Sequence, residues 1–482
     1  MNGLLTLIQQ LLIWGHLILV VAMAVRVIMR RLPVGATLAW ILVLMVFPYF
    51  GVALYLLFGE RFLGVKRAQR EARLRFVFRD APVSPPSAVA IDWSDYHASA
   101  EPLSRLEAFI SGIPPVAGNN VEFLQSAPHI IDSLAADIKS AESFCHMEFY
   151  IWQPGGETDK VVAAIEQAAA RGVVFRIMLD AVGSSAFFGS EAHKRLKDIG
   201  ASVVKACPIG IIPWQLARYD LRNHRKTVII DQRVAYMGSF NLVDPKLFKV
   251  DAGVGEWIDV MARVSGPAVP QFDAVFRWYW SIERSEPLLK MSGQPVVVVG
   301  EALVQVAPSG PDVAKESILN ALLQAIYGAK YSVDIVTPYF VPGEALEHAL
   351  KIAARRGVQV RLLVPEKVDS FLVRHASHSY FSSLMEAGVS IATYGKGLLH
   401  TKAVVVDNSL AFFGTVNMDL RSLWLNFEMT MIIYDVATVR SLAEIIESYR
   451  HDSEVVELAQ WRQRRAVSRF FENITHLVSP LI

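Results

Sequence analysis

Six residue positions recur with identical spacing in two places of the chain, 176 residues apart. Each copy offers a histidine, a lysine, an aspartate, a glycine, a hydroxyl and an amide, and chance rarely repeats so many positions. The copies consist of His224, Lys226, Asp231, Gly238, Ser239 and Asn241, and of His400, Lys402, Asp407, Gly414, Thr415 and Asn417. These residue types suit chemistry on a phosphodiester, and two such half-sites facing each other would enclose one phosphate.

The two histidines and two lysines divide the chemistry between them. Lysines and neutral donors can hold the charge that develops on the phosphate oxygens. One neutral imidazole can attack phosphorus and form a covalent phosphohistidine. The other, when protonated, can donate a proton to the leaving oxygen and later deprotonate an incoming alcohol. Because the two copies are nearly symmetric, spacing leaves open which of His224 and His400 attacks.

Short strands are predicted to carry both copies. The β-branched runs 224–230 and 400–406 indicate strands, in which each histidine and its lysine face the same side. Turns follow at 231–232 and 407–408, and the returning strands 235–237 and 411–413 bring the hydroxyls and amides back beside them. Asp231 and Asp407 belong to the catalytic motifs, but we expect them to brace the turns rather than touch substrate.

Strands alternate with helices on both sides of the motifs, which predicts an α/β fold. The expected elements are strand 145–152, helix 159–171 and strand 173–179, repeated as strand 331–337, helix 344–356 and strand 358–364. We therefore expect two pseudo-symmetric α-β-α halves that share one active site. The first half is assigned to residues 116–290 and the second to 291–482. The C-terminal segment of the second half, 461–482, is expected either to lie on a membrane surface as an amphipathic helix or to pack on the protein.

An N-terminal membrane hairpin is expected within residues 1–60. Residues 3–25 and 32–59 carry no charged side chain, and each exceeds the roughly 20 residues that cross a bilayer. A cleaved signal peptide is disfavoured because a basic start is missing, while an interfacial helix is the alternative for the first stretch. Residues 61–115 are assigned to a basic juxtamembrane segment and a linker, with a Pro-rich passage at 81–90.

The distribution of basic residues favours a cytoplasmic catalytic region. Six basic residues follow the second expected span, against three arginines between the spans. The larger group comprises Arg61, Lys66, Arg67, Arg70, Arg73 and Arg75. The predicted location is therefore an inner membrane, crossed more than once.

Composition limits the remaining possibilities. The formal net charge of +1 gives no general attraction to nucleic acid, so no nucleic-acid partner is expected. The two cysteines, Cys145 and Cys207, give no disulfide framework. No grouping of residues has metal-ligand spacing, and we predict a reaction without metal or cofactor.

The two copies match the signature H-x-K-x4-D followed by G-[ST]-x-N, so the chain resembles the phospholipase D superfamily. Segments 149–156, 251–259, 337–342 and 421–428 are similar to those of bacterial cardiolipin synthases. This resemblance implies that His224 is the nucleophile and His400 the general acid and base. It also implies that the phosphate is contacted by Lys226, Lys402, Asn241 and Asn417, with Ser239 and Thr415 in support.

The same resemblance implies a carboxylate downstream of each motif that orients the imidazole. Glu428 lies at the expected distance after His400. Glu256 is the less regular candidate for His224, because it lies four residues further along its half.

The implied function is that of a membrane-anchored phosphatidyltransferase. Two phosphatidylglycerol molecules would give cardiolipin and glycerol, with the lipid bilayer as the setting. A hydrolytic phospholipase D, a nuclease of the same superfamily and a binding protein with an inactive site are the alternatives. The sequence leaves open whether phosphatidylethanolamine or another alcohol is accepted, and the oligomeric state.

Overall fold

The computed structural model describes residues 2–30, 32, 34–59, 67, 69–70, 91–208, 220–288, 297–312 and 317–478. It consists of two compact units. The first contains residues 1–66 together with 209–221, and the second contains nearly all the rest. The linker predicted at 81–90, much of the basic segment and the boundary predicted near 290 lie outside the described residues.

The described part of the first unit is helical. Its elements are α1 (Asn2–Met29), α2 (Val34–Val46), α3 (Pro48–Leu54) and the π-helix η1 (Tyr55–Gly59). Val27, Trp40, Leu44 and Tyr55 form a small buried cluster between them. The helix is interrupted between α2 and α3 because Pro48, the first residue of α3, has no backbone N–H to donate.

The sequence predicts two membrane-spanning helices in this region. Among the described residues, no helix is both long enough and apolar enough to cross a bilayer. The second expected stretch, 32–59, is divided among α2, α3 and η1.

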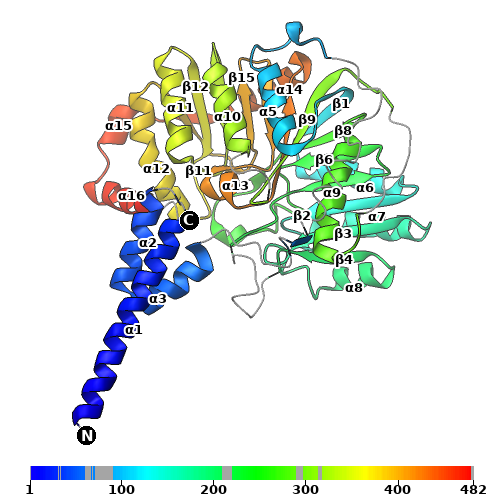
Figure 1. The fold of residues 1–482 in the computed structure, drawn as a ribbon. Coiled ribbons are helices and arrows are strands. Elements are labelled where there is room, and N and C mark those ends of the chain that lie inside the picture. The colour runs from blue at the N-terminus through cyan, green and yellow to red at the C-terminus, as the bar shows by residue number, and fades with distance from the viewer. Residues whose placement is uncertain are drawn as a thin grey trace. The chain divides into compact units, whose positions relative to one another are not determined.

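A single mixed sheet dominates the described part of the second unit (Figure 1). From one edge to the other its strands are β19 (Ser453–Val455), β13 (Ser390–Tyr394), β12 (Gln359–Pro365), β10 (Ser332–Val336), β15 (Ala403–Val406), β16 (Leu410–Gly414), β18 (Glu428–Ile433), β9 (Ala302–Ser309), β1 (Val116–Leu124), β8 (Met261–Ser265), β6 (Val234–Gly238), β5 (Thr227–Ile230), β2 (Phe144–Phe149), β3 (Val174–Asp180) and β4 (Ser202–Ala206).

The strand order is symmetric about the antiparallel pair β1 and β9. Outward from β9 it reads β18, β16, β15, β10, β12 and β13, and outward from β1 it reads β8, β6, β5, β2, β3 and β4. Each strand of the first half therefore has a counterpart in the second. The prediction of an α/β fold with two pseudo-symmetric halves is confirmed.

Helices cover the sheet in each half. In the first half they are α6 (Ala127–Lys139), α7 (Asp159–Ala169), α8 (Glu191–Asp198) and α9 (Val269–Arg284). In the second half they are α10 (Ser317–Gly328), α11 (Gly343–Arg355), α12 (Phe371–Glu386) and α14 (Val436–His451). Outside these sets lie α5 (Ala100–Ser111), α13 (Leu420–Trp424), α15 (Leu458–Arg462) and α16 (Ala466–Val478), with the short 3-10 turns η2 (Trp93–Asp95), η3 (Gly156–Thr158) and η5 (Val250–Ala252).

The side chains of β2 point alternately to the two faces of the sheet, and each face is covered by helices. Cys145, Met147 and Phe149 belong to the buried cluster that includes α6, α7 and α8. His146 points to the opposite face, where its ring stacks on Phe276 of α9 at 4.6 Å between centroids. The period-2 pattern of the strand thus buries both faces of the sheet.

The predicted strands and helices of both halves are confirmed with end shifts of up to three residues. The motif strands are shorter than predicted, since β5 and β15 begin after the His and Lys of each motif. Cys145 and Cys207 are buried free thiols. At the C-terminus, α16 buries Glu472 and Thr475 while leaving Phe470 and Phe471 exposed, so it packs on the protein and keeps an apolar outer surface.

Candidate active site

Tight turns anchor the two motif hairpins. Both central residues of each turn, Asp231 with Gln232 and Asp407 with Asn408, have positive φ, as the common hairpin turn of this type requires. The carboxylate of Asp231 accepts hydrogen bonds from the backbone N–H groups of residues 142, 143 and 144, each at 2.8 Å. Asp407 accepts the equivalent bonds from residues 330, 331 and 332. Both aspartates thus lie at the turn end of their hairpins and brace them.

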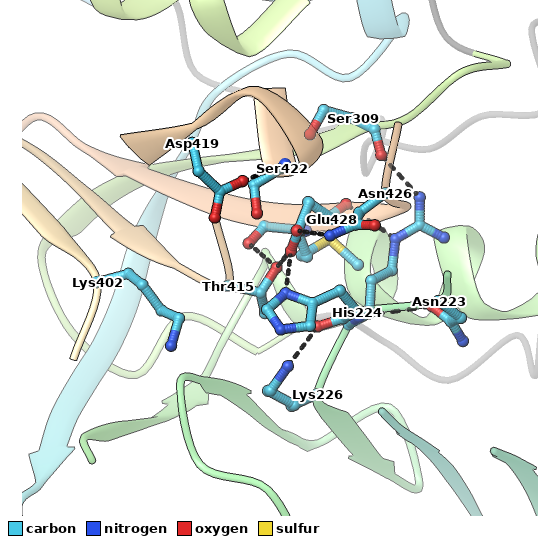
Figure 2. A network of polar contacts seen from close by, with 12 residues as sticks. Asn223, His224, Lys226, Ser309, Lys402, Thr415, Asp419, Ser422, Asn426 and Glu428 are labelled. Atoms are coloured by element: carbon cyan, nitrogen blue, oxygen red, sulfur yellow. Dashed lines mark hydrogen bonds and ion pairs between the residues drawn. The ribbon is translucent and has the colours of Figure 1, made fainter. Parts of the chain in front are cut away.

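At the opposite end of each hairpin, a histidine and a lysine lie side by side. Lys226 Nζ donates to the backbone oxygen of His224 at 2.6 Å, and Lys402 Nζ donates to that of His400 at 2.6 Å. All four side chains are buried. Figure 2 draws Lys226 below and Lys402 to the left of the His224 imidazole, and the charges of both lysines lower the pKa of that ring, so groups from both half-sites act on it.

Each imidazole is hydrogen-bonded to a carboxylate from the other half. His224 Nδ1 lies 2.9 Å from Glu428 Oε2, and His400 Nδ1 lies 2.7 Å from Asp259 Oδ1. Glu428 contacts a motif histidine, as expected, but that histidine is His224 rather than His400 (Figure 2). Glu256 was expected to orient His224, and the structure contradicts this: its side chain is exposed, and His224 already has Glu428.

Backbone pairing between the halves explains this exchange. Strand β7 (Trp257–Ile258) pairs in parallel with β14 (Leu398–Leu399), and the His400 N–H donates to the Ile258 oxygen at 2.8 Å. In the same way the His224 N–H donates to the Phe427 oxygen at 2.9 Å. Each histidine therefore lies beside the residue that follows its paired strand, which is Asp259 or Glu428.

Asp259 is the counterpart of Glu428, and sequence reasoning missed it. Ser239 N donates to the oxygen of residue 260, just as Thr415 N donates to that of residue 429. The interval from motif histidine to carboxylate is 35 residues in the first half (259 − 224) and 28 in the second (428 − 400). A signal was available, because each carboxylate lies at the start of a largely apolar segment: Asp259 lies two residues before β8, and Glu428 is the first residue of β18.

The hydroxyls of the motifs support the carboxylates. Thr415 Oγ1 donates to Glu428 Oε2 at 2.5 Å, and Asn426 Nδ2 donates to the other oxygen at 3.2 Å (Figure 2). Ser239 Oγ accepts from the N–H of Val260, the neighbour of Asp259, at 3.1 Å. These contacts place Ser239 and Thr415 beside the carboxylates that hold the two imidazoles.

The two motif amides are held differently. Asn241 Oδ1 accepts from the Ile151 N–H at 3.2 Å, which leaves its NH2 group as the outward donor. Asn417 Oδ1 is buried and has no hydrogen-bond partner among the described residues. A ligand that carries a hydroxyl or amide could satisfy it.

Burial lowers the pKa of both imidazoles to about 4, and the neighbouring lysines add to this effect while the paired carboxylates oppose it. Without substrate, both are therefore neutral at pH 7. A neutral ring that donates Nδ1–H to a carboxylate keeps its lone pair on Nε2. Burial also lowers the pKa of Lys226 to about 8 and that of Lys402 well below its usual value. A bound anion would raise the pKa of both lysines, because a nearby negative charge favours their charged form.

Aromatic rings border the histidines. The Tyr150 ring lies 5.0 Å from that of His224, and the Trp257 ring lies 4.4 Å from that of His400. Behind the site, the buried Arg225 lies 3.7 Å above the Tyr279 ring and donates to the Glu428 backbone oxygen at 2.9 Å. Among the described residues, no group of three or more His, Cys, Asp or Glu side chains could hold a metal ion.

Comparison with protein-family models gives two matches. The model described as "Cardiolipin synthase, PLD-like domain" matches residues 134–280 and 322–450, and thus covers both motifs. The model described as "Phospholipase_D-nuclease N-terminal" matches residues 18–60.

Curated relatives match along the whole chain. Cardiolipin synthase A of Serratia proteamaculans is 40% identical over 481 residues, covering 99% of both chains. Cardiolipin synthase A of Edwardsiella ictaluri is 39% identical over 482 residues, again covering 99% of each. Among solved structures, phosphatidylserine synthase of Haemophilus influenzae superposes with a TM-score of 0.59 at 14% identity, over 79% of this chain and 100% of that one. This last likeness concerns the fold.

Proposed function

We propose a reaction for this chain on the basis of its family, because it belongs to the cardiolipin synthases of the phospholipase D superfamily and is a phosphatidyltransferase. Its substrates are phospholipids and its product is cardiolipin. The specific reaction that we propose joins two phosphatidylglycerol molecules into cardiolipin and glycerol, reversibly, through a phosphatidyl-histidine intermediate.

In the first step, His224 Nε2 attacks the phosphorus of one phosphatidylglycerol. The N–P bond forms, the bond from phosphorus to the glycerol oxygen breaks, and His400 Nε2 delivers a proton to that oxygen. His400 must be protonated for this. A bound phosphodiester anion would raise the pKa of both imidazoles, because an adjacent negative charge favours the charged form.

In the second step, the terminal hydroxyl of another phosphatidylglycerol attacks the phosphatidyl-histidine. A new P–O bond forms, the N–P bond breaks, and the hydroxyl proton moves to His400. Lys226, Lys402, Asn241 and Asn417 are proposed to hold the phosphate oxygens in both steps. Glu428 and Asp259 are proposed to fix the tautomers, and Asp231 and Asp407 to maintain the hairpins.

The single observation that carries this proposal is the crossed pair of contacts, His224 with Glu428 and His400 with Asp259. Each half lacks a complete acid–base pair of its own, so the halves form one site. This also supports the division into halves at 116–290 and 291–482.

We propose that the N-terminal helices anchor the enzyme in the bacterial inner membrane as a hairpin crossing it twice, with a cytoplasmic catalytic region. Large apolar side chains of α1 and α2 are exposed, including Ile18, Val21, Leu38 and Leu42. A patch of this kind is typical of a membrane contact. Cysteine labelling from either side of the membrane would test the sidedness, with residues introduced near 31 and 91.

The reaction is tested by incubating the full chain in micelles of phosphatidylglycerol without added divalent metal, alongside His224→Ala and His400→Ala. We expect cardiolipin and glycerol by mass spectrometry of the lipid products, and a loss of both in each variant. Phosphatidic acid as the sole product would instead indicate a hydrolase. Cleavage of added nucleic acid without lipid turnover would overturn the proposal.

A further inference from the structure

The two half-sites differ at the position two residues before the motif histidine. Arg222, His224 and Lys226 alternate along an extended segment, because Asn223 pairs with Phe427 and the N–H of Phe427 donates to the Arg222 oxygen at 2.9 Å. Alternation places Arg222 on the same side as His224. At the equivalent position of the second half, two residues before His400, the chain has Leu398.

The partner of Arg222 breaks the symmetry as well. Arg222 Nη1 lies 3.3 Å from Asp180 Oδ1, at the end of β3. The registers of β2 with β3 and of β10 with β12 give Asp180 the counterpart Pro365 at the end of β12. Leu398 is buried in an apolar cluster with Trp257 and Phe248. One side of the site is thus cationic where the other is apolar.

The carboxylate that holds Arg222 is itself fixed. Asp180 accepts hydrogen bonds from the backbone N–H groups of Val182, Gly183 and Asn223, each at 2.9 Å. Four donors therefore position this buried carboxylate, and it orients the guanidinium beside the histidine segment. A guanidinium presents five N–H donors and suits a phosphate.

A second arginine lies in the same region. Burial and Asp180 raise the pKa of the Tyr150 hydroxyl, whereas Arg421 and Arg222 lower it, so both arginines act on one group beside His224. Arg421 comes from α13 of the second half, where its counterpart in the first half is Pro245. Both cations are additional to the duplicated motifs.

In the reaction proposed above, such a cation could bind a second phosphate group. The attacked phosphodiester occupies the two lysines, but the acceptor phosphatidylglycerol brings a second phosphodiester that does not react. Three carbons and an oxygen separate its hydroxyl from its phosphorus, a span comparable to the about 6.6 Å that two residues cover along a strand. Glycerol and water, the competing acceptors, carry no such charge.

We propose that Arg222 binds the unreacting phosphodiester of the acceptor lipid and so makes the site select an anionic lipid alcohol over a neutral alcohol or water. This inference rests on the proposed function. In the transfer step the acceptor oxygen forms its bond to phosphorus, the bond from phosphorus to His224 breaks, and the proton passes to His400, while Arg222 holds the acceptor without exchanging a proton.

The test compares two acceptors in one enzyme. Wild-type chain and the variants Arg222→Leu and Arg222→Lys are given phosphatidylglycerol micelles, first alone and then with labelled glycerol. Cardiolipin reports transfer to the anionic acceptor, and label in phosphatidylglycerol reports transfer to the neutral one. Arg263→Leu, which removes an arginine paired with Asp137 between β8 and α6, is the matched control.

We expect Arg222→Leu to lower cardiolipin formation by about tenfold or more, as loss of a charged hydrogen bond does, with glycerol exchange changed by less than about threefold. Phosphatidic acid should rise, and Arg222→Lys should fall between wild type and Arg222→Leu. The control should leave the ratio of the two transfers unchanged.

Parallel loss of both transfers in Arg222→Leu and Arg222→Lys would overturn the inference, since the Arg222–Asp180 pair would then only maintain the fold. An unchanged ratio of the two transfers would overturn it as well. Failure of the wild-type chain to make cardiolipin would instead overturn the proposed function, so the two failures are distinguishable.

Discussion

The imidazole of His224 and the carboxylate of Glu428 lie 2.9 Å apart, although 204 residues separate them in the sequence. His400 has the reciprocal contact with Asp259, 141 residues away. Exchange of carboxylates between two pseudo-symmetric halves means that neither half can orient its own histidine. The active site is therefore complete only when the two halves are joined in one sheet.

Replacing Glu428 by Gln should impair catalysis more than binding. An amide cannot stabilise the imidazolium, and its NH2 group can select the wrong tautomer. We expect kcat to fall about a hundredfold or more, with KM for phosphatidylglycerol little changed. Steady-state kinetics in micelles would check this, and a change confined to KM would contradict the orienting role.

The variants Asp259→Asn and Glu256→Gln separate the structural assignment from the one based on spacing. Asp259 is buried against His400, whereas the Glu256 side chain is exposed. Asp259→Asn should lose activity on the scale of Glu428→Gln, while Glu256→Gln should stay within about threefold of wild type. The opposite order of activities would show that Glu256 reaches a histidine in the working enzyme.

Acid should destabilise the protein through the two motif histidines, His224 and His400. Burial lowers the pKa of both to about 4, from a usual value of 6.5. Between these values the unfolded chain binds more protons, so the free energy of unfolding falls as the pH decreases from about 6.5 to about 4, and is fully retained above 6.5.

Thermal unfolding of the full chain at pH 7.5 and 4.5 would measure this effect. The double variant with His224→Gln and His400→Gln is the control, because it removes both titrating groups. It should lose less stability on acidification than wild type. An equal loss in both proteins would assign the effect to other buried histidines, such as His146 and His378, whose pKa values burial also lowers.

The variant Asp407→Asn should have a lower free energy of unfolding than wild type. The carboxylate accepts three backbone N–H groups and contacts His97 at 2.9 Å, and an amide can replace only part of this set. We expect a loss of about 2 kcal/mol in the free energy of unfolding. Denaturant unfolding would measure it, and the kcat of the remaining folded protein should be nearly unchanged. A large drop in kcat at unchanged stability would instead place Asp407 in the chemistry.

Much of the site could be predicted from the sequence because its signals are local. The alternation that places His224 beside Lys226, and the turn at Asp231 and Gln232, depend on neighbouring residues. The carboxylate partners could not be assigned in this way. They depend on pairing between β7 and β14, which lie far apart in the chain, and on seven extra residues before Asp259.

Spacing alone also favoured Glu256 over Asp259, because it assumes that both halves have loops of equal length. The contrast between Arg222 and Leu398 was visible in the sequence at the same offset as the motifs. It acquires meaning only when the bridge at Asn223 shows that the segment is extended and that Arg222 faces the His224 side.

The most direct test of the two-histidine mechanism is mass spectrometry of protein denatured with detergent at neutral pH, where the N–P bond survives, after brief incubation with phosphatidylglycerol. In the wild-type chain one phosphatidyl group should be found on the peptide that contains His224. His400→Asn keeps the nucleophile but lacks the proton carrier of both steps, so it should form the same adduct more slowly. His224→Asn should carry none. A phosphatidyl group on His400 in the His224→Asn protein, or undiminished cardiolipin synthesis by either variant, would contradict the assignment.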